Sequence, residues 1–465
     1  MTDKRYSKII TFVLIVGTVG LVTYLGLSHF FKVDDSVTVV DSHVAGEAET
    51  SSLLGEVNEE KTKRDVITDA EVVKPTVDEI AEQLGMDMHF DDPEELVNQV
   101  MKRMSLIDSE RGVQDLAKVL GNGMINQKQL NQLNRLYSEK RMKLRENEAV
   151  ELLGEIKAGK LSRWALYLSD SSEIQLQTIR EKDGKWKIDK VMLPLPNTNV
   201  AGEKLTVEQR QARDLELSLK DSLNFSHLFL KTLVKQDFEK ARMMANSEDV
   251  SDAKIAGLCI LFEDGEYRVN KQKPLQAVRM TEEMSAFYVN LKSNDDSDAQ
   301  FSVNTLKNDD GSEWRISEIN LDRLLEDYAK KVAGGDVYYT PLIKNPGGGD
   351  LLVIYFDFDS EGLTDRTKKQ LDIVVQLLKL DNRKKVRLSG HTDGLGSDTY
   401  NLGLSEKRAI AVKEYLSNQG IQSQQLVTEA LGFSKPRRPE LAGEDGADDS
   451  SARRANRRTE IYLDF

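Results

Sequence analysis

The stretch "SGHTDGLGSDTYNLGLSEKRAIAVKEYL", residues 389–416, decides how the C-terminal part of this 465-residue chain is interpreted. A glycine-rich loop carries one carboxylate, Asp393, and an amphipathic helix is expected to follow the loop. Arg408 lies on the apolar face of that helix, which is marked at i, i+4 spacing by Leu404, Val412 and Leu416. Because a guanidinium group is not left unpaired in a protein core, Arg408 is predicted to reach a carboxylate, a backbone carbonyl or a ligand.

Two arrangements of Asp393 and Arg408 fit this spacing. In the first, the two side chains form an internal ion pair that ties the loop to the helix. In the second, they face a solvent-reachable notch, where Asp393 takes an ammonium group and Arg408 takes a carboxylate in bidentate geometry. The N-terminus of the helix would add free N–H donors for the anion. The second arrangement predicts a binding site for a zwitterion.

The segments around this stretch predict an α+β sandwich of helices on a sheet, in the order β-α-β-α-β-β. Apolar runs rich in β-branched and aromatic residues indicate buried strands. Thr364 is expected to cap the first helix and Asn401 or Ser405 the second, which should end before Gly420. The four expected strands are 351–358, 384–391, 426–433 and 458–465.

Three segments together resemble the OmpA-like C-terminal domain that Pal lipoproteins and MotB-type stator proteins share: "FDFDS" (356–360), residues 390–412 and "ANRRTEI" (455–461). The pattern T-D-x-x-G-x-x-x-x-N-x-x-L-S-x-x-R-A is met at every specified position. The resemblance covers about residues 351–465 and implies non-covalent binding of peptidoglycan through the diaminopimelate of its stem peptide. It implies these binding residues: Asp393, Arg408, Asn401, Asp357 and Arg457.

The sequence departs from the family pattern in two places. Leu395 occupies a loop position that is often polar in relatives, and this change would remove one hydrogen bond to the ligand. The segment 436–452 is long and acidic, so it could cover or restrict the binding groove.

Residues 9–31, "IITFVLIVGTVGLVTYLGLSHFF", contain no charged side chain. About 20 apolar residues in a helix cross a hydrocarbon core of ~30 Å, so a membrane-spanning anchor in the lipid bilayer is predicted. A cleaved signal peptide is the alternative, but the following "LSHFFKVDD" lacks the small residues of a cleavage site. The basic residues before the span place the N-terminus in the cytoplasm and the remainder in the periplasm. The cytoplasmic membrane is favoured, and outer-membrane association is the alternative.

The middle of the chain contains an internal repeat. Residues 174–193 and 299–321 each give an alternating strand, an Asp-Gly turn and the motif W-[KR]-I-x-x-[VI]-x-L, with helical stretches upstream. Helices followed by a curled antiparallel sheet resemble the nuclear-transport-factor-2-like superfamily, which implies a spacer, a protein-contact module or a ligand cone. The expected parts are a tail and anchor (1–32), an acidic tether (33–90), repeat 1 (91–200), repeat 2 (205–332), a Gly/Pro linker (333–350) and the C-terminal domain (351–465).

Composition bears on the remaining function classes. The net charge of −14 gives no nucleic-acid footprint, so no nucleic-acid partner is expected. The single cysteine, Cys259, lies among apolar residues, and the five histidines have no metal-ligand spacing. We therefore predict no metal, no cofactor and no catalytic residue. Together with the predicted anchor, the resemblance to the OmpA-like domain implies a non-enzymatic envelope protein of a Gram-negative bacterium that tethers membrane to wall.

Three alternatives were weighed against this prediction. A motor stator would need an acidic residue within its span, and residues 9–31 have none. An envelope-assembly scaffold would use the middle domains to bind protein partners. An enzyme acting on peptidoglycan, such as an amidase, would need a zinc cluster or an activated nucleophile, and the repeats offer neither pattern.

Overall fold

The computed structural model describes residues 90–120, 125–199, 202–308, 310–331, 338–344, 350–380, 382–440 and 450–463. The predicted anchor at 9–31 and nearly all of the predicted tether lie outside these residues. Within the described ranges, no helix is both long enough and apolar enough to cross a membrane. Helices and sheets are mixed throughout, so the predicted α+β class is confirmed.

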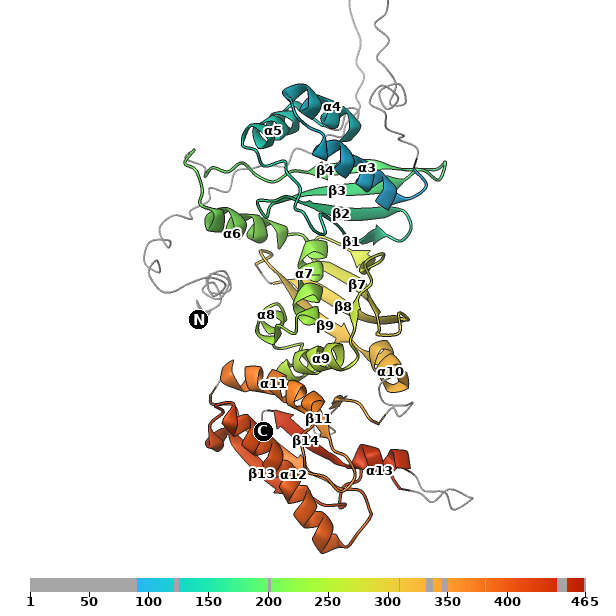
Figure 1. Ribbon diagram of the computed structural model, residues 1–465, viewed down its shortest axis with the longest axis vertical. Coiled ribbons are helices and arrows are strands. Elements are labelled where there is room, and N and C mark those ends of the chain that lie inside the picture. Colours follow the sequence, from blue (N-terminus) through green and yellow to red (C-terminus); the bar gives the residue numbers. More distant parts are fainter. Residues whose placement is uncertain are drawn as a thin grey trace, which may run out of the picture. The chain divides into compact units, whose positions relative to one another are not determined.

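The first repeat places three helices on one face of a four-stranded antiparallel sheet (Figure 1). The helices are α3 (Pro93–Ser105), α4 (Glu110–Leu120) and α5 (Gln127–Ser138). The strands are β1 (Val150–Lys157), β2 (Leu161–Tyr167), β3 (Glu173–Arg180) and β4 (Trp186–Met192). Helix α3 begins where the sequence favours it, because the side chain of Asp92 accepts a hydrogen bond from the Glu94 N–H and Pro93 occupies the first turn.

The second repeat has the same plan with more helices. The helices are α6 (Val207–Ser218), α7 (Ser222–Val234), α8 (Phe238–Met243), α9 (Asp252–Asp264) and α10 (Asp322–Lys331). The strands are β5 (Arg268–Val269), β6 (Leu275–Met280), β7 (Met284–Lys292), β8 (Asp298–Lys307) and β9 (Trp314–Asn320). Side chains of β7 alternate strictly between buried and half-buried, as expected for a strand that covers a core with one face. Trp186 and Trp314 begin the second strands of the equivalent hairpins β3–β4 and β8–β9.

The two repeats share one sheet, with strand order β4-β3-β2-β1-β6-β7-β8-β9 and β5 paired to β7. The junction is a parallel pairing of β1 with β6, where Glu155 lies opposite Gln276. Gly154 allows the close approach at this point, since a Cβ there would lie 2.9 Å from the Leu275 carbonyl oxygen.

The C-terminal part forms a separate five-stranded sheet with order β10-β11-β14-β12-β13. Its strands are β10 (Leu342–Lys344), β11 (Asp350–Tyr355), β12 (Val386–Gly390), β13 (Leu426–Ala430) and β14 (Arg458–Leu463). Its helices are α11 (Asp365–Leu380), α12 (Asp398–Asn418), the 3-10 turn η2 (Ser423–Gln425) and α13 (Ser450–Asn456). Strand β10 falls in the segment predicted as a linker, and α13 begins in the acidic segment 436–452 and extends beyond it, so neither element was predicted.

Helices α9 and α11 join the second repeat to this C-terminal part. The carboxylate of Asp264, whose side chain has no exposed surface, accepts hydrogen bonds from Arg366 Nε at 2.8 Å and from the Tyr328 hydroxyl at 3.0 Å. Arg366 Nη2 also donates to the Tyr328 hydroxyl at 2.7 Å. Apolar residues of both parts belong to one continuous core, so the contact is packed as well as polar.

Candidate functional site

Helix α12 presents Arg408 to the interior of the C-terminal domain. The helix begins at Asp398 and is capped by Ser397, whose hydroxyl accepts a hydrogen bond from the Tyr400 N–H at 3.2 Å. The cap therefore lies one turn before Asn401, which the sequence analysis offered as a capping residue together with Ser405. Arg408 is fully buried on the predicted apolar face.

The guanidinium of Arg408 donates to three backbone carbonyls. Nε bonds the Ser360 oxygen at 2.8 Å, Nη1 bonds the His391 oxygen at 2.9 Å and Nη2 bonds the Asp357 oxygen at 3.1 Å. Of the three partners that the sequence allowed, the structure uses the backbone carbonyl. Burial lowers the pKa of Arg408 to about 10, and the charge of Asp393 opposes that shift, so the side chain stays cationic at neutral pH.

These three bonds fasten the loop after β11 and the end of β12 to one side chain. The Phe356 ring lies 5.3 Å from the guanidinium carbon and adds a cation–π contact. Arg408 thus holds the floor of the site in place, and no atom of it is open to solvent in this state.

Asp393 is paired with Arg457. Arg457 Nη1 donates to Asp393 Oδ2 at 3.1 Å, and the two side chains keep 14% and 7% of their surface exposed. The structure shows no direct Asp393–Arg408 ion pair: Arg408 contacts carbonyl oxygens, Arg457 takes the carboxylate, and the charge of Asp393 still acts on Arg408. The pairing follows from strand register: Gly390 of β12 lies opposite Thr459 of β14, which brings the residues beyond these two strand ends together.

Two polar side chains around this pair are buried without a hydrogen-bond partner. Asn401 is 3% exposed and Thr392 is 1% exposed, and neither the Asn401 Oδ1 nor the Thr392 Oγ1 finds a partner among the described residues. Asn401 Oδ1 lies beneath the loop, 3.6 Å from where a Cβ on Gly396 would be. Buried polar atoms are rarely left unpaired, so these two are natural acceptors for a ligand or a water molecule.

Asp357 reaches the site through its backbone carbonyl, and its side chain is exposed. Sequence reasoning missed two exposed aromatic side chains near the site, Phe358 (62% exposed), whose ring lies 6.0 Å from the Arg457 guanidinium, and Tyr400 (53% exposed). The Tyr400 hydroxyl donates to the Asp359 carboxylate, which fixes the ring. Strand alternation would place Phe358 on the same buried face as Phe356, but β11 ends at Tyr355, so alternation gives no signal for the exposure of Phe358. Leu395, the departure from the family pattern, is 45% exposed in the loop that carries Asp393.

The acidic segment touches the Asp393 loop at its first residues. The carboxylate of Glu440 accepts from the Gly394 N–H at 3.1 and 3.0 Å and from Asn456 Nδ2 at 2.9 Å. Residues 441–449 lie outside the described residues. The segment therefore borders the site at Glu440.

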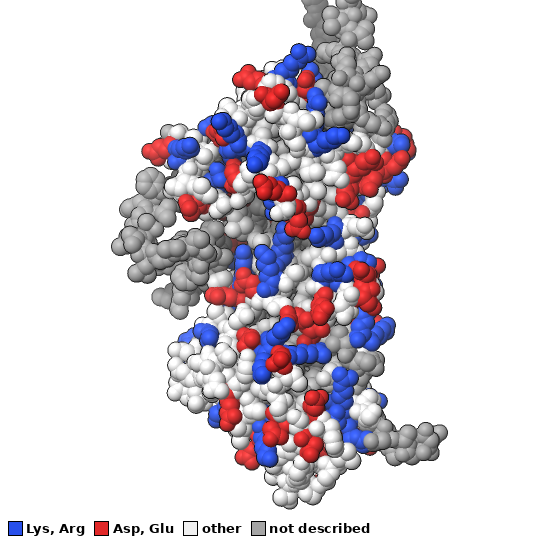
Figure 2. Space-filling model, in the orientation of Figure 1, with Lys and Arg blue, Asp and Glu red and all other residues white. Residues whose placement is uncertain are grey.

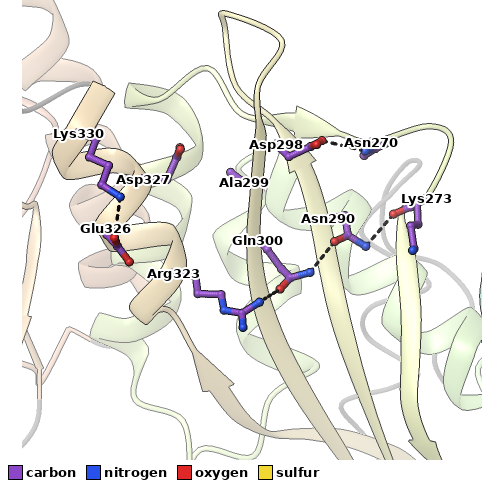
Figure 3. A pocket seen from close by; sticks show the side chains of 10 residues that line it. All are labelled: Asn270, Lys273, Asn290, Asp298, Ala299, Gln300, Arg323, Glu326, Asp327 and Lys330. Carbon is purple, nitrogen blue, oxygen red and sulfur yellow. Dashed lines mark hydrogen bonds and ion pairs between the residues drawn. The ribbon is translucent and has the colours of Figure 1, made fainter. Parts of the chain in front are cut away.

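A cavity of about 470 Å³ lies away from this site, in the second repeat beside α10 (Figure 3). Figure 3 shows its polar side chains linked to one another: Arg323 bonds Gln300, Gln300 bonds Asn290, and Asn290 bonds the Lys273 carbonyl. Because these groups already satisfy each other, the cavity offers few free partners to a ligand.

Neither the charges on the face shown in Figure 2 nor metal-ligand clusters single out a further site among the described residues. On that face, acidic and basic side chains of the described residues are interspersed (Figure 2). Among the described residues, no group of three or more His, Cys, Asp or Glu side chains could hold a metal ion. Burial raises the pKa of the Cys259 thiol to about 12, so that residue is a buried, unreactive side chain.

A model of the OmpA family matches residues 355–456. The chain is 40% identical over 121 residues to photosystem I P700 chlorophyll a apoprotein A2 of Gloeobacter violaceus, covering 25% of this chain and 14% of that protein. It is 39% identical over 83 residues to a peptidoglycan-associated lipoprotein of Buchnera aphidicola, covering 18% of this chain and 48% of that protein. The crystal structure of the peptidoglycan-associated lipoprotein from Burkholderia pseudomallei aligns at 33% identity and a TM-score of 0.22, covering 24% of this chain and 88% of that one.

The chain spans less than half the length of both curated relatives. The family match includes Asp357, Asp393, Asn401 and Arg408, and it ends one residue before Arg457. The chain therefore carries an OmpA-like domain at its C-terminus, and the site built around Arg408 lies within it.

Proposed function

We propose that this protein is a membrane-anchored envelope protein whose OmpA-like domain binds peptidoglycan non-covalently through the diaminopimelate of the stem peptide. The observation that carries the proposal is the nearly buried Asp393–Arg457 pair in a domain of this family, with two unpartnered polar atoms beside it. Diaminopimelate offers an ammonium and a carboxylate on one carbon, which match the two charges of that pair.

In this proposal, binding is an exchange of partners. The ligand ammonium takes the place of the Arg457 guanidinium on Asp393, and the released Arg457 binds the ligand carboxylate. Asn401 Oδ1 and Thr392 Oγ1 accept further hydrogen bonds from the ligand. Arg408 adds positive charge from below, and a direct contact between Arg408 and the carboxylate would require the covering loops at 357–360 or 393–396 to move.

The anchor at 9–31 would then connect this grip on the wall to a membrane. The protein would be a single-pass protein with its bulk in the periplasm, without catalytic activity. Its two middle repeats would set the spacing or contact protein partners.

The test is sedimentation of the full-length chain with isolated peptidoglycan. Asp393→Asn keeps the shape of the side chain and removes its charge, so it should weaken binding by about 10- to 100-fold, the value of one charge-assisted hydrogen bond of ~1.5–3 kcal/mol. Free diaminopimelate should compete with the wall for the unmodified protein. The matched control is Asp365→Asn, at a carboxylate that is 96% exposed, which should bind normally.

Sedimentation of Asp393→Asn equal to that of Asp365→Asn, with an unchanged melting temperature for both, would refute the proposed site. Arg457→Gln adds an independent measurement, because the exchange model predicts loss of affinity for this variant as well.

A further inference from the structure

A groove of about 780 Å³ opens in the first repeat, between the C-terminal half of α3 and the segment 140–150. Its apolar lining includes Met101, Ile107, Tyr137, Leu144 and Val150, which are partly buried and pack on the core of this repeat. Apolar side chains that line a hollow of this size leave water in contact with surface that a ligand would cover. Two further methionines, Met104 and Met142, give the lining a side chain that adapts to ligands of varied shape.

The walls of the groove are held in place by hydrogen bonds. The Tyr137 hydroxyl donates to the Asp108 carbonyl at 2.7 Å, which fixes the end of α5 against the turn after α3. In the segment 140–150, Arg141 lies between the lining residues Lys140 and Met142, is 5% exposed and donates from Nε to Asp170 Oδ2 at 2.6 Å. The hollow is therefore preformed rather than a gap between loose segments.

Basic side chains surround this apolar lining: Lys102, Lys140, Lys143 and Arg145. Of the acidic side chains in the lining, Glu148 pairs with Lys271 at 2.8 Å, and Glu146 stands 4.0 Å from Lys143. Among the described residues, Lys102 and Lys140 form no ion pair, and both are exposed. A cationic rim is notable in a chain whose net charge is −14.

We propose that this groove binds a single-chain anionic amphiphile, with the acyl chain on the methionine-lined floor and the anionic head group against the lysines. An apolar floor attracts the acyl chain, and the basic side chains of the lining favour a negatively charged head group. Along the sequence, the groove belongs to the first repeat, the predicted domain nearest to the predicted membrane anchor, which would keep it near a source of lipid.

The size of the groove favours a small amphiphile over a polypeptide. Its volume lies within the range of about 300–1,000 Å³ that encloses most of one small ligand. A stable protein partner would instead need about 800 Å² of contact surface on this side. An acidic amphipathic peptide is therefore the competing occupant that the experiment must separate from the lipid.

The experiment uses the full-length chain in nanodiscs and a lysophosphatidylglycerol that carries a diazirine in its acyl chain. After irradiation, mass spectrometry should locate the label in peptides that contain residues 101–107 and 142–150. Lys140→Glu with Lys143→Glu should reduce that labelling at least fivefold. The charge-matched control, Lys160→Glu with Lys182→Glu, changes exposed turn residues of the same repeat and should label like the unmodified chain. A zwitterionic lysophosphatidylcholine probe should label the groove weakly.

Three results would overturn the proposal. The first is equal labelling of the groove in the two double variants. The second is labelling confined to other parts of the chain. The third is protection of the groove by an acidic amphipathic peptide at the concentration of the probe, which would replace the lipid with a polypeptide partner.

Discussion

Replacing Arg408 by methionine should unfold the C-terminal domain at a lower temperature, whether or not a ligand is present. Methionine keeps an unbranched apolar stem, but it is shorter than arginine and has no N–H groups. The carbonyls of Ser360, His391 and Asp357 then lose their donors, and the first two belong to backbone that is at least partly buried.

The size of the effect follows from two opposing contributions. Hydrogen bonds to a charged group contribute about 1.5–3 kcal/mol each, and three of them are lost. Removing a buried charge returns its desolvation penalty, which is several kcal/mol in proteins. We therefore expect a net loss of about 3 kcal/mol, close to the ~3–5 kcal/mol measured when one partner of a buried ionic contact is removed.

The assay is thermal unfolding followed by calorimetry, with Lys407→Met as the control. Lys407 precedes Arg408 on α12 and is exposed, so its replacement should change stability by less than about 0.5 kcal/mol. For a domain of this size, a loss of 3 kcal/mol lowers the melting temperature by roughly 10 °C. Arg408→Lys should behave like the methionine variant, because a compact ammonium cannot span carbonyls that a planar guanidinium bridges. Equal melting temperatures for Arg408→Met and Lys407→Met would refute the reasoning.

Three further predictions concern the framework around the site. Asp264→Ala removes the buried carboxylate that receives Arg366, and denaturant titration should show a loss of about 3–5 kcal/mol. Burial lowers the pKa of His391, so the folded state resists protonation of this side chain. The contribution of His391 to folding stability should be fully present above about pH 6.5, the pKa of histidine in the unfolded chain, and should be lost as the pH falls below that value. His391→Asn should therefore flatten the change in melting temperature between about pH 7.5 and 5.5. Gly390→Ala should prevent normal folding, because its Cβ would lie 2.0 Å from a backbone oxygen of α12. Gly403→Ala lies on an open face of the same helix and should stabilise the domain by about 0.5–1 kcal/mol. Thermal melts followed by circular dichroism compare the two variants.

The burial of Arg408 could be predicted from sequence, but its partners could not. Helical spacing alone places residue 408 on the same face as Leu404 and Val412, and all three are buried. The partners are carbonyl oxygens from two segments that lie 17 and 48 residues away along the chain. Backbone carbonyls carry no sequence signature, so only the folded positions of β11 and β12 could identify them.

The Asp393–Arg457 pair could not be predicted from sequence for a different reason. Asp393 was identified from its place in the glycine-rich loop and Arg457 from the family resemblance, but the pairing depends on which residue of β14 faces which residue of β12. A slip of one position in that register would direct Arg457 to the other face of the sheet. The junction of the two repeats could not be predicted either. In sequence β1 and β6 are ordinary strands, and their parallel pairing at Glu155 and Gln276 depends on tertiary packing.

The state of the site before binding bears on how the proposed tether would work. Asp393 and Arg457 already satisfy each other, so a zwitterionic ligand would gain only the difference between its own contacts and the pair that it breaks. Affinity for one stem peptide should therefore be modest. A cell wall presents many identical stem peptides, and a membrane would present many copies of the anchored chain. Weak exchange at each site then adds up to a firm attachment of the two surfaces, while every single contact stays reversible as the wall is remodelled.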